Sequence, residues 1–70
     1  MKYLIVIEAT ATGFSAYSPD VPGCVATGAT REEVVREMRS AIALHLEGLR
    51  QSGGEYPQPS SSSAYVDVPA

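Results

Sequence analysis

The side chains of this chain that could take part in chemistry are eight carboxylates, one histidine and one cysteine. The carboxylates are Glu8, Asp20, Glu32, Glu33, Glu37, Glu47, Glu55 and Asp67. Metal-dependent nuclease chemistry needs several carboxylates converging on two ions about 3.5–4 Å apart. Glu8 is expected at a strand end and Asp20 in a turn, while most of the others pair with arginines on the solvent side of a predicted helix. We therefore interpret these groups as solvated charge, and expect no enzyme, no metal site and no other cofactor.

His45 and Cys24 are the remaining candidates. A lone histidine on the apolar side of a helix is most often packed and hydrogen-bonded, with a place in an oligomer or partner interface as the alternative. No serine or acid can be assigned beside His45 for general-base catalysis. Cys24 follows a tight turn and has no basic neighbour in sequence, so we expect a small buried hydrophobe rather than a reactive thiol. One cysteine and one histidine can form neither an internal disulfide nor a structural metal cage.

Four segments of the chain have strand-like patterns. They cover residues 2–8, 14–18, 24–27 and 64–68. The first is rich in β-branched residues and too short for a helix. Tyr3, Ile5 and Ile7 share one of its faces, and Leu4 and Val6 share the other. Because both faces are apolar, we expect this strand to be central in a sheet and covered on both sides.

The sharpest local signal in the sequence lies between the second and third predicted strands. Pro19 ends the second strand because proline has no N–H for the ladder. Pro22 and Gly23 supply the fixed φ and then the positive φ that a type II turn requires at its central positions. We expect the carboxylate of Asp20 to accept hydrogen bonds from nearby backbone amides of this turn, with a contact to a partner protein as the alternative.

A long amphipathic helix is predicted over residues 31–52. Thr30 can cap its N-terminus, and Glu33 three residues later completes a capping box. Gly53 is a natural left-handed cap at the other end. The apolar side of the helix fits within an arc of roughly 140°. Its members are Val34, Val35, Met38, Ala41, Ile42, His45, Leu46 and Leu49. Leu44 lies outside this arc, where an isolated surface leucine is unremarkable.

The element order β-β-β-α-β fits a single domain over residues 1–70. It predicts an α+β fold, a two-layer sandwich with one long helix on one face of a mostly antiparallel sheet. A domain of this size with no disulfide or metal buries barely enough apolar area to offset its conformational entropy. We therefore expect a homodimer or a higher homo-oligomer, formed through the sheet face that the helix leaves open or through a sheet edge.

The charge of the chain bears on its partners. Five basic and eight acidic side chains give a net charge of −3. Nonspecific nucleic-acid binding depends on clustered basic side chains, so this balance argues against phosphate backbones and favours a basic protein partner. The longest apolar runs are far shorter than the ~20 residues that cross a bilayer, and the chain does not open on a leader. These features predict a cytoplasmic protein with no membrane partner.

Two stretches form a specific pattern together with the helix that follows them. They are Ser18-Pro19-Asp20-Val21-Pro22-Gly23-Cys24 and Ala26-Thr27-Gly28-Ala29-Thr30-Arg31-Glu32-Glu33, followed by Ala41-Ile42 and Leu44-His45-Leu46-Glu47-Gly48-Leu49. The pattern resembles the HicB-like antitoxin family, as do the glycines and prolines of residues 53–59. The residues that carry the family signature are Asp20, Pro22, Gly23, Cys24, Thr30 and Glu33. The resemblance covers nearly the whole chain and implies a partial RNase H-like fold with the same element order.

The resemblance also implies a partner and a role. Family members bind and neutralise HicA-like toxins, which are small basic ribonucleases that cleave mRNA. We therefore expect an antitoxin-like protein-binding module that occludes the active, RNA-binding face of such a toxin. Full-length relatives carry a C-terminal DNA-binding segment. This chain ends at Ala70 without one, so we expect a short form that does not bind DNA directly.

Two other classes of function compete with this reading. The first is a stand-alone homo-oligomeric scaffold or ligand-sensing domain without a toxin partner, which the two-sided apolar first strand favours. A metal-dependent enzyme ranks last. The residues that we single out as a possible interface are Tyr3, Ile5, Leu44 and His45.

Overall fold

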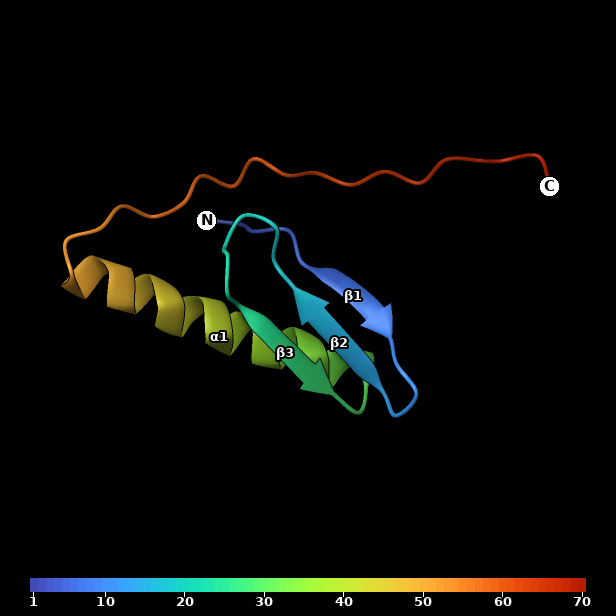
Figure 1. Ribbon diagram of the computed structural model, residues 1–70, viewed down its shortest axis with the longest axis horizontal. Coiled ribbons are helices and arrows are strands. Elements are labelled where there is room, and N and C mark those ends of the chain that lie inside the picture. Colours follow the sequence, from blue (N-terminus) through green and yellow to red (C-terminus); the bar gives the residue numbers. More distant parts are fainter.

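The computed structural model describes all residues, 1–70. It contains three strands and one helix, in the order β1 (Val6–Ala9), β2 (Phe14–Tyr17), β3 (Val25–Gly28) and α1 (Arg31–Gln51). Figure 1 shows the three strands side by side, the helix behind them, and the rest of the chain running back as an extended line. The predicted α+β fold with antiparallel strands and one long helix is confirmed. α1 does not combine the length and apolar character needed to cross a membrane.

The sheet has the strand order β1-β2-β3, so β2 is central and β1 lies at an edge. This corrects the expectation that the first strand is central and covered on both sides. β1 is also shorter than the predicted strand over residues 2–8. Its first residue, Val6, pairs with Tyr17, the last residue of β2, and the chain turns away directly after Tyr17. Residues 2–5 are therefore left without a ladder partner on that side.

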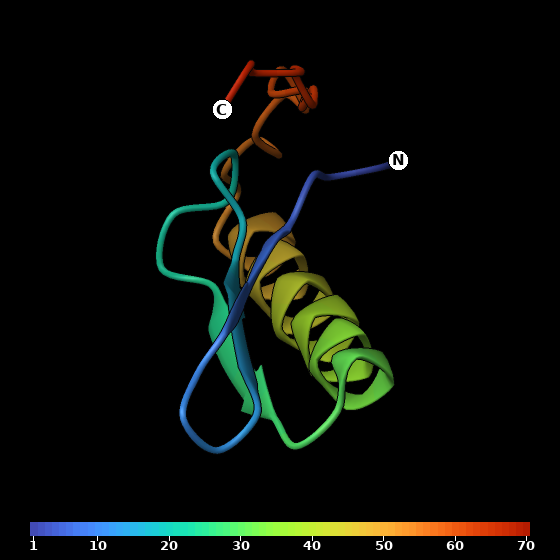
Figure 2. The ribbon, with the colours of Figure 1, turned by 90° about the vertical axis from the view of Figure 1, so that its right-hand side faces the viewer.

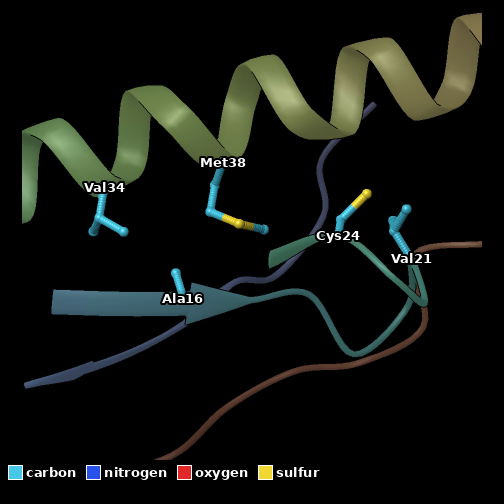
Figure 3. Packing of buried hydrophobic residues seen from close by; sticks show 5 residues of the cluster. All are labelled: Ala16, Val21, Cys24, Val34 and Met38. Carbon is cyan, nitrogen blue, oxygen red and sulfur yellow. The ribbon is translucent and has the colours of Figure 1, made fainter. Parts of the chain in front are cut away.

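The helix packs on one face of the sheet, which gives the predicted two layers (Figure 2). Five buried side chains form the core between the layers. They are Ala16, Val21, Cys24, Val34 and Met38. Figure 3 shows Val34 and Met38 reaching from the helix toward Ala16 of β2, while the segment between β2 and β3 contributes Val21 and Cys24. The first half of the helix and the turn after β2 therefore hold the two layers together.

Capping interactions explain where the helix begins and ends. The Thr30 hydroxyl accepts a hydrogen bond from the backbone N–H of Glu33 at 3.1 Å. The Glu33 carboxylate accepts a bond from the backbone N–H of Ala29 at 3.1 Å, one residue earlier than a standard capping box would place it. Gly53 ends the helix with a φ of +79°, a conformation that favours glycine. The observed bounds agree with the predicted 31–52 to within one residue.

The single chain has no fourth strand, so the prediction of a strand over residues 64–68 is wrong for it. The segment runs as extended chain (Figure 1), but none of its backbone groups hydrogen-bonds to another part of the protein. Alternation with period two reports which side chains share a face. It does not report whether a neighbouring strand is within reach, and in this chain none is.

Candidate partner-binding surfaces

Asp20 fastens the end of the chain to the turn between β2 and β3. Its carboxylate accepts four hydrogen bonds from two consecutive serines. The backbone N–H groups of Ser60 and Ser61 donate to Oδ2 at 3.1 and 2.9 Å, and their hydroxyls donate to Oδ1 at 3.2 and 2.8 Å. Asp20 therefore bonds backbone amides, but these lie 40 and 41 positions later in the chain and not, as had been expected, in its own turn.

We call these four hydrogen bonds the Asp20 clamp, and they also affect the ionisation of the Asp20 carboxyl. They hold the pKa of the Asp20 carboxyl below its ordinary value, because they stabilise the ionised form, and the bond from the backbone N–H of Ser61 contributes most. The carboxylate is thus ionised at neutral pH and accepts all four bonds. The serine run of residues 60–63, which reads in the sequence as a polar connector, supplies both donors.

Two further hydrogen bonds fix the residues that precede β1. The Tyr3 hydroxyl donates to the carbonyl of Pro57 at 2.7 Å, and so ties the start of the chain to the segment after the helix. The buried Ser18 hydroxyl donates to the carbonyl of Leu4 at 2.8 Å. Residues 3–5 are consequently held in place beside the helix although they belong to no ladder.

A groove of about 550 Å³ lies between the start of the chain and the helix. Its lining consists of Met1, Lys2, Tyr3, Ile5, Val35, Arg39, Ile42, Ala43 and Leu46. The groove exists because α1 packs against β3 and β2, so the side of the helix nearest β1 has no strand beneath it. We call this surface the β1 groove. It contains Tyr3 and Ile5, two of the four residues that the sequence singled out as a possible interface.

A second exposed apolar surface lies on the sheet face opposite the helix. The strand register places Val6, Tyr17 and Val25 in one row across β1, β2 and β3. Tyr17 is 42% exposed and Val25 69% exposed. The neighbouring row on the same face contains Glu8 and Ser15. We call this surface the open sheet face. Sequence reasoning expected a contact on the face that the helix leaves open but did not name these residues, because the row depends on strand register and not on spacing along the chain.

The remaining candidate residues are distributed singly. Leu44 is 76% exposed on the helix, and His45 is half-buried beside it. Cys24 is buried, its thiol donates to the carbonyl of Ala41 at 3.7 Å, and burial raises the pKa of the thiol. Glu47 pairs with Arg50 one turn along the helix, and this hydrogen bond lowers the pKa of the Glu47 carboxyl. No three His, Cys, Asp or Glu side chains come together in a group that could hold a metal ion.

The chain matches a known protein family along almost its entire length. The model of a family described as the HicB-like antitoxin of bacterial toxin-antitoxin systems matches residues 3–70. The chain belongs to this family. The resemblance that rests on the turn, the helix start and the long helix is thereby confirmed.

Individual relatives agree with the family match. An uncharacterized 14.9 kDa protein of Haemophilus phage HP1 is 35% identical over 69 residues, which are 99% of this chain and 52% of the phage protein. Antitoxin HicB 2 of Photorhabdus laumondii is 32% identical over 71 residues, which are 100% of this chain and 51% of that antitoxin. The chain therefore spans about half the length of these two relatives. A UPF0150 protein of Thermoplasma acidophilum is 27% identical, with 94% of this chain and 97% of that protein covered.

A solved structure is similar to the fold of this HicB-like chain. It is described as a HicA3 and HicB3 toxin-antitoxin complex, and the likeness has a TM-score of 0.71 at 35% sequence identity. It covers 86% of this chain and 70% of the matched chain. The two chains are therefore similar in sequence as well as in the arrangement of their strands and helix.

The residues that were predicted to carry the family signature occupy positions that hold the fold together. Asp20 clamps the C-terminal segment, and Gly23 has a φ of +89° in the turn, as the sequence predicts for the residue after Pro22. Cys24 belongs to the core. Thr30 and Glu33 form the helix start described above. The signature therefore lies mainly on one structural unit, which joins the turn after β2 to the helix and to the end of the chain.

Proposed function

We propose that this chain is an antitoxin module that binds a HicA-like ribonuclease toxin and neutralises it. The observation that carries the proposal is the likeness, at 35% identity over 86% of this chain, to a chain of a HicA3 and HicB3 toxin-antitoxin complex. Membership of the HicB-like antitoxin family supports it independently. The site of action is the cytoplasm, where the mRNA substrate of such a toxin is found.

The mode of action is occlusion of the RNA-binding face of the toxin, without catalysis by this chain. A toxin that binds RNA must present basic side chains to phosphates, and a net charge of −3 complements such a surface. The carboxylates of this chain with resolved partners serve structural purposes: Asp20 holds the chain end, Glu33 the helix start and Glu47 an arginine. Because these carboxylates stabilise the fold, they support a binding role for the chain in preference to a catalytic one.

The open sheet face is the surface that we assign to the toxin. Tyr17 and Val25 are direct neighbours across β2 and β3, and both side chains are exposed, which is typical of an interaction site when polar groups surround the apolar pair. Glu8 lies in the adjacent row and adds negative charge to this face. Leu44 lies on the helix, in the other layer, and is an isolated apolar residue.

A co-purification experiment with matched variants tests the proposal. The chain is co-expressed with a tagged, small basic HicA-like protein, and the tagged toxin is recovered from the cells. We expect the unmodified chain and Leu44→Glu to be recovered with the toxin, and Tyr17→Glu to be lost. Both variants place one new carboxylate at an exposed apolar position, so they differ in the face that they alter and not in chemistry.

The outcomes separate the alternatives. Recovery of the toxin without any of the three proteins contradicts the proposal and favours a scaffold or sensing domain that has no toxin partner. Loss of Leu44→Glu with retention of Tyr17→Glu keeps the antitoxin role but moves the contact from the open sheet face to the helix. Self-association belongs to the proposal as well, since the small core of five buried side chains leaves apolar surface available for a second copy.

A further inference from the structure

We propose that two copies of this chain exchange their C-terminal strands, so that residues 64–68 of each copy pair with β1 of the other and fill its β1 groove. The proposal deepens the expected self-association by naming the contact. It is independent of toxin binding, which we assign to the open sheet face.

The first observation is an extended segment without a partner. Residues 64–68 make no backbone hydrogen bond within their own chain, although they have the alternation of a strand. Val66 and Val68 are 80% and 71% exposed, and Tyr65 is fully exposed. An extended apolar segment with unpaired N–H and C=O groups is a template for pairing with another chain.

The second observation is that the edge of β1 and the groove beside it can accept such a strand. β1 is an edge strand, so the N–H and C=O groups on its outer side are unpaired. Beside this edge lies the β1 groove, where the helix presents Val35, Ile42 and Leu46 with no strand beneath them. Residues 2–5, strand-like in sequence but outside any ladder, lie along the same edge and extend its length. A fourth strand at this position would pair with the edge and cover the helix.

The side-chain pattern of the segment fits this acceptor in one orientation. Ala64, Val66 and Val68 share one face of an extended chain, and Tyr65 and Asp67 share the other. The first face is wholly apolar and suits the lining of the groove. Asp67 would then point away from the helix, where its charge remains solvated.

The clamp at Asp20 explains why the acceptor belongs to another copy. Ser60 and Ser61 are held over the turn between β2 and β3 by four hydrogen bonds, and Tyr3 holds Pro57 just before them. The C-terminal end of the chain lies away from the sheet and the helix, as Figures 1 and 2 both show. The clamped segment therefore presents its strand to a neighbour and leaves its own β1 groove open.

Light scattering on paired variants tests the exchange. Val66 is 80% exposed in its own chain, so Val66→Asp should leave the isolated fold intact, and circular dichroism verifies this. Burying an aspartate in place of a valine should raise the dimer dissociation constant by at least roughly tenfold. Gln58→Asp adds the same charge to the C-terminal segment outside the exchanged strand, and this control should remain dimeric like the unmodified chain.

A mixing experiment identifies the two halves of the contact. Ala43 is exposed and lines the β1 groove, so Ala43→Glu blocks the acceptor, whereas Ser40→Glu alters an exposed helix position outside it and serves as the control. We expect Val66→Asp and Ala43→Glu each to be monomeric alone. Mixed together they should form a heterodimer, because the intact strand of Ala43→Glu can enter the intact groove of Val66→Asp.

Two outcomes overturn the exchange, and a third overturns its independence from toxin binding. A dimer that survives both Val66→Asp and Ala43→Glu uses another surface, which leaves the expected self-association standing. If the unmodified chain is monomeric at high micromolar concentration, no strand is exchanged, and residues 64–68 occupy their own β1 groove or no groove at all. If the dimer is lost in Val66→Asp together with toxin binding, the segment contacts the toxin. Retention of toxin binding by monomeric Val66→Asp is the result that we expect.

Discussion

Replacing Gly28 with alanine should destabilise the protein, because a Cβ atom has no room where β3 meets the helix. A Cβ built on Gly28 would lie 2.7 Å from the backbone nitrogen of Val34, 3.1 Å from its Cα and 3.2 Å from the carbonyl carbon of Glu33. All three atoms are backbone, so no side chain can rotate away. The helix start or the end of β3 must shift, and overpacking of this kind costs about 1–3 kcal/mol.

Gly48 provides a matched control for the same substitution. It lies inside the helix with no atom within 4 Å of an added Cβ, and it has an ordinary helical φ. Gly48→Ala should therefore stabilise the protein by about 0.8–1 kcal/mol, the difference in helix propensity between the two residues. The two substitutions are identical in chemistry and are expected to have opposite signs.

Urea unfolding at one fixed protein concentration measures both effects, since the stability of a self-associating protein depends on concentration. For a domain of this size each kcal/mol corresponds to roughly 4–8 °C in Tm. Gly28→Ala should lower the midpoint and Gly48→Ala should raise it. A Gly28→Ala protein as stable as the unmodified chain would refute the close approach of β3 to the helix, and with it the packing of the two layers.

Three further substitutions or conditions give defined outcomes. Thr30→Ala should cost about 1 kcal/mol of unfolding free energy in the same assay, whereas Thr30→Ser should retain the cap; equal losses in both would contradict the capping role. The lowered pKa of Asp20 means that its clamp is complete above the unfolded Asp pKa of 3.8 and is lost as the pH falls through the folded pKa. The Ser61 amide should therefore lose its downfield NMR shift in strong acid, and at neutral pH in Asp20→Asn; a shift independent of pH would contradict the clamp. Burial raises the pKa of the Cys24 thiol, so alkylation at neutral pH should be slow until urea unfolds the chain, and equally fast reaction in both states would contradict its burial.

Local signals in the sequence were sufficient for most of the fold. The capping residue Thr30, the apolar period of the helix and the turn at Gly23 act over a few residues, and the structure places each of these elements as predicted. The α+β class followed from the order of these elements. The first strand was misplaced because its two apolar faces were assigned to full burial, whereas β1 lies at the edge, next to the β1 groove.

The candidate surfaces depend on contacts between distant parts of the chain, and sequence reasoning recovered only part of them. Tyr3 was noted as an interface residue, but its bond to Pro57 joins residues 54 positions apart. The row that contains Tyr17 and Val25 requires the strand register. The clamp between Asp20 and Ser61 had one signal in the sequence, an acid in a signature turn, and no signal for its donors. The prediction of a strand over residues 64–68 was wrong for a related reason, since a ladder needs a neighbouring strand that the single chain does not provide.

Inhibition of RNA cleavage by the purified chain is the most direct test of the central claim that this protein is an antitoxin module. A HicA-like toxin is held at a concentration well above the dissociation constant, and the chain is titrated in while the cleavage of a labelled mRNA is followed. The account predicts that the rate falls linearly to zero and breaks at one chain per toxin molecule. Full cleavage activity in the presence of excess chain would contradict it.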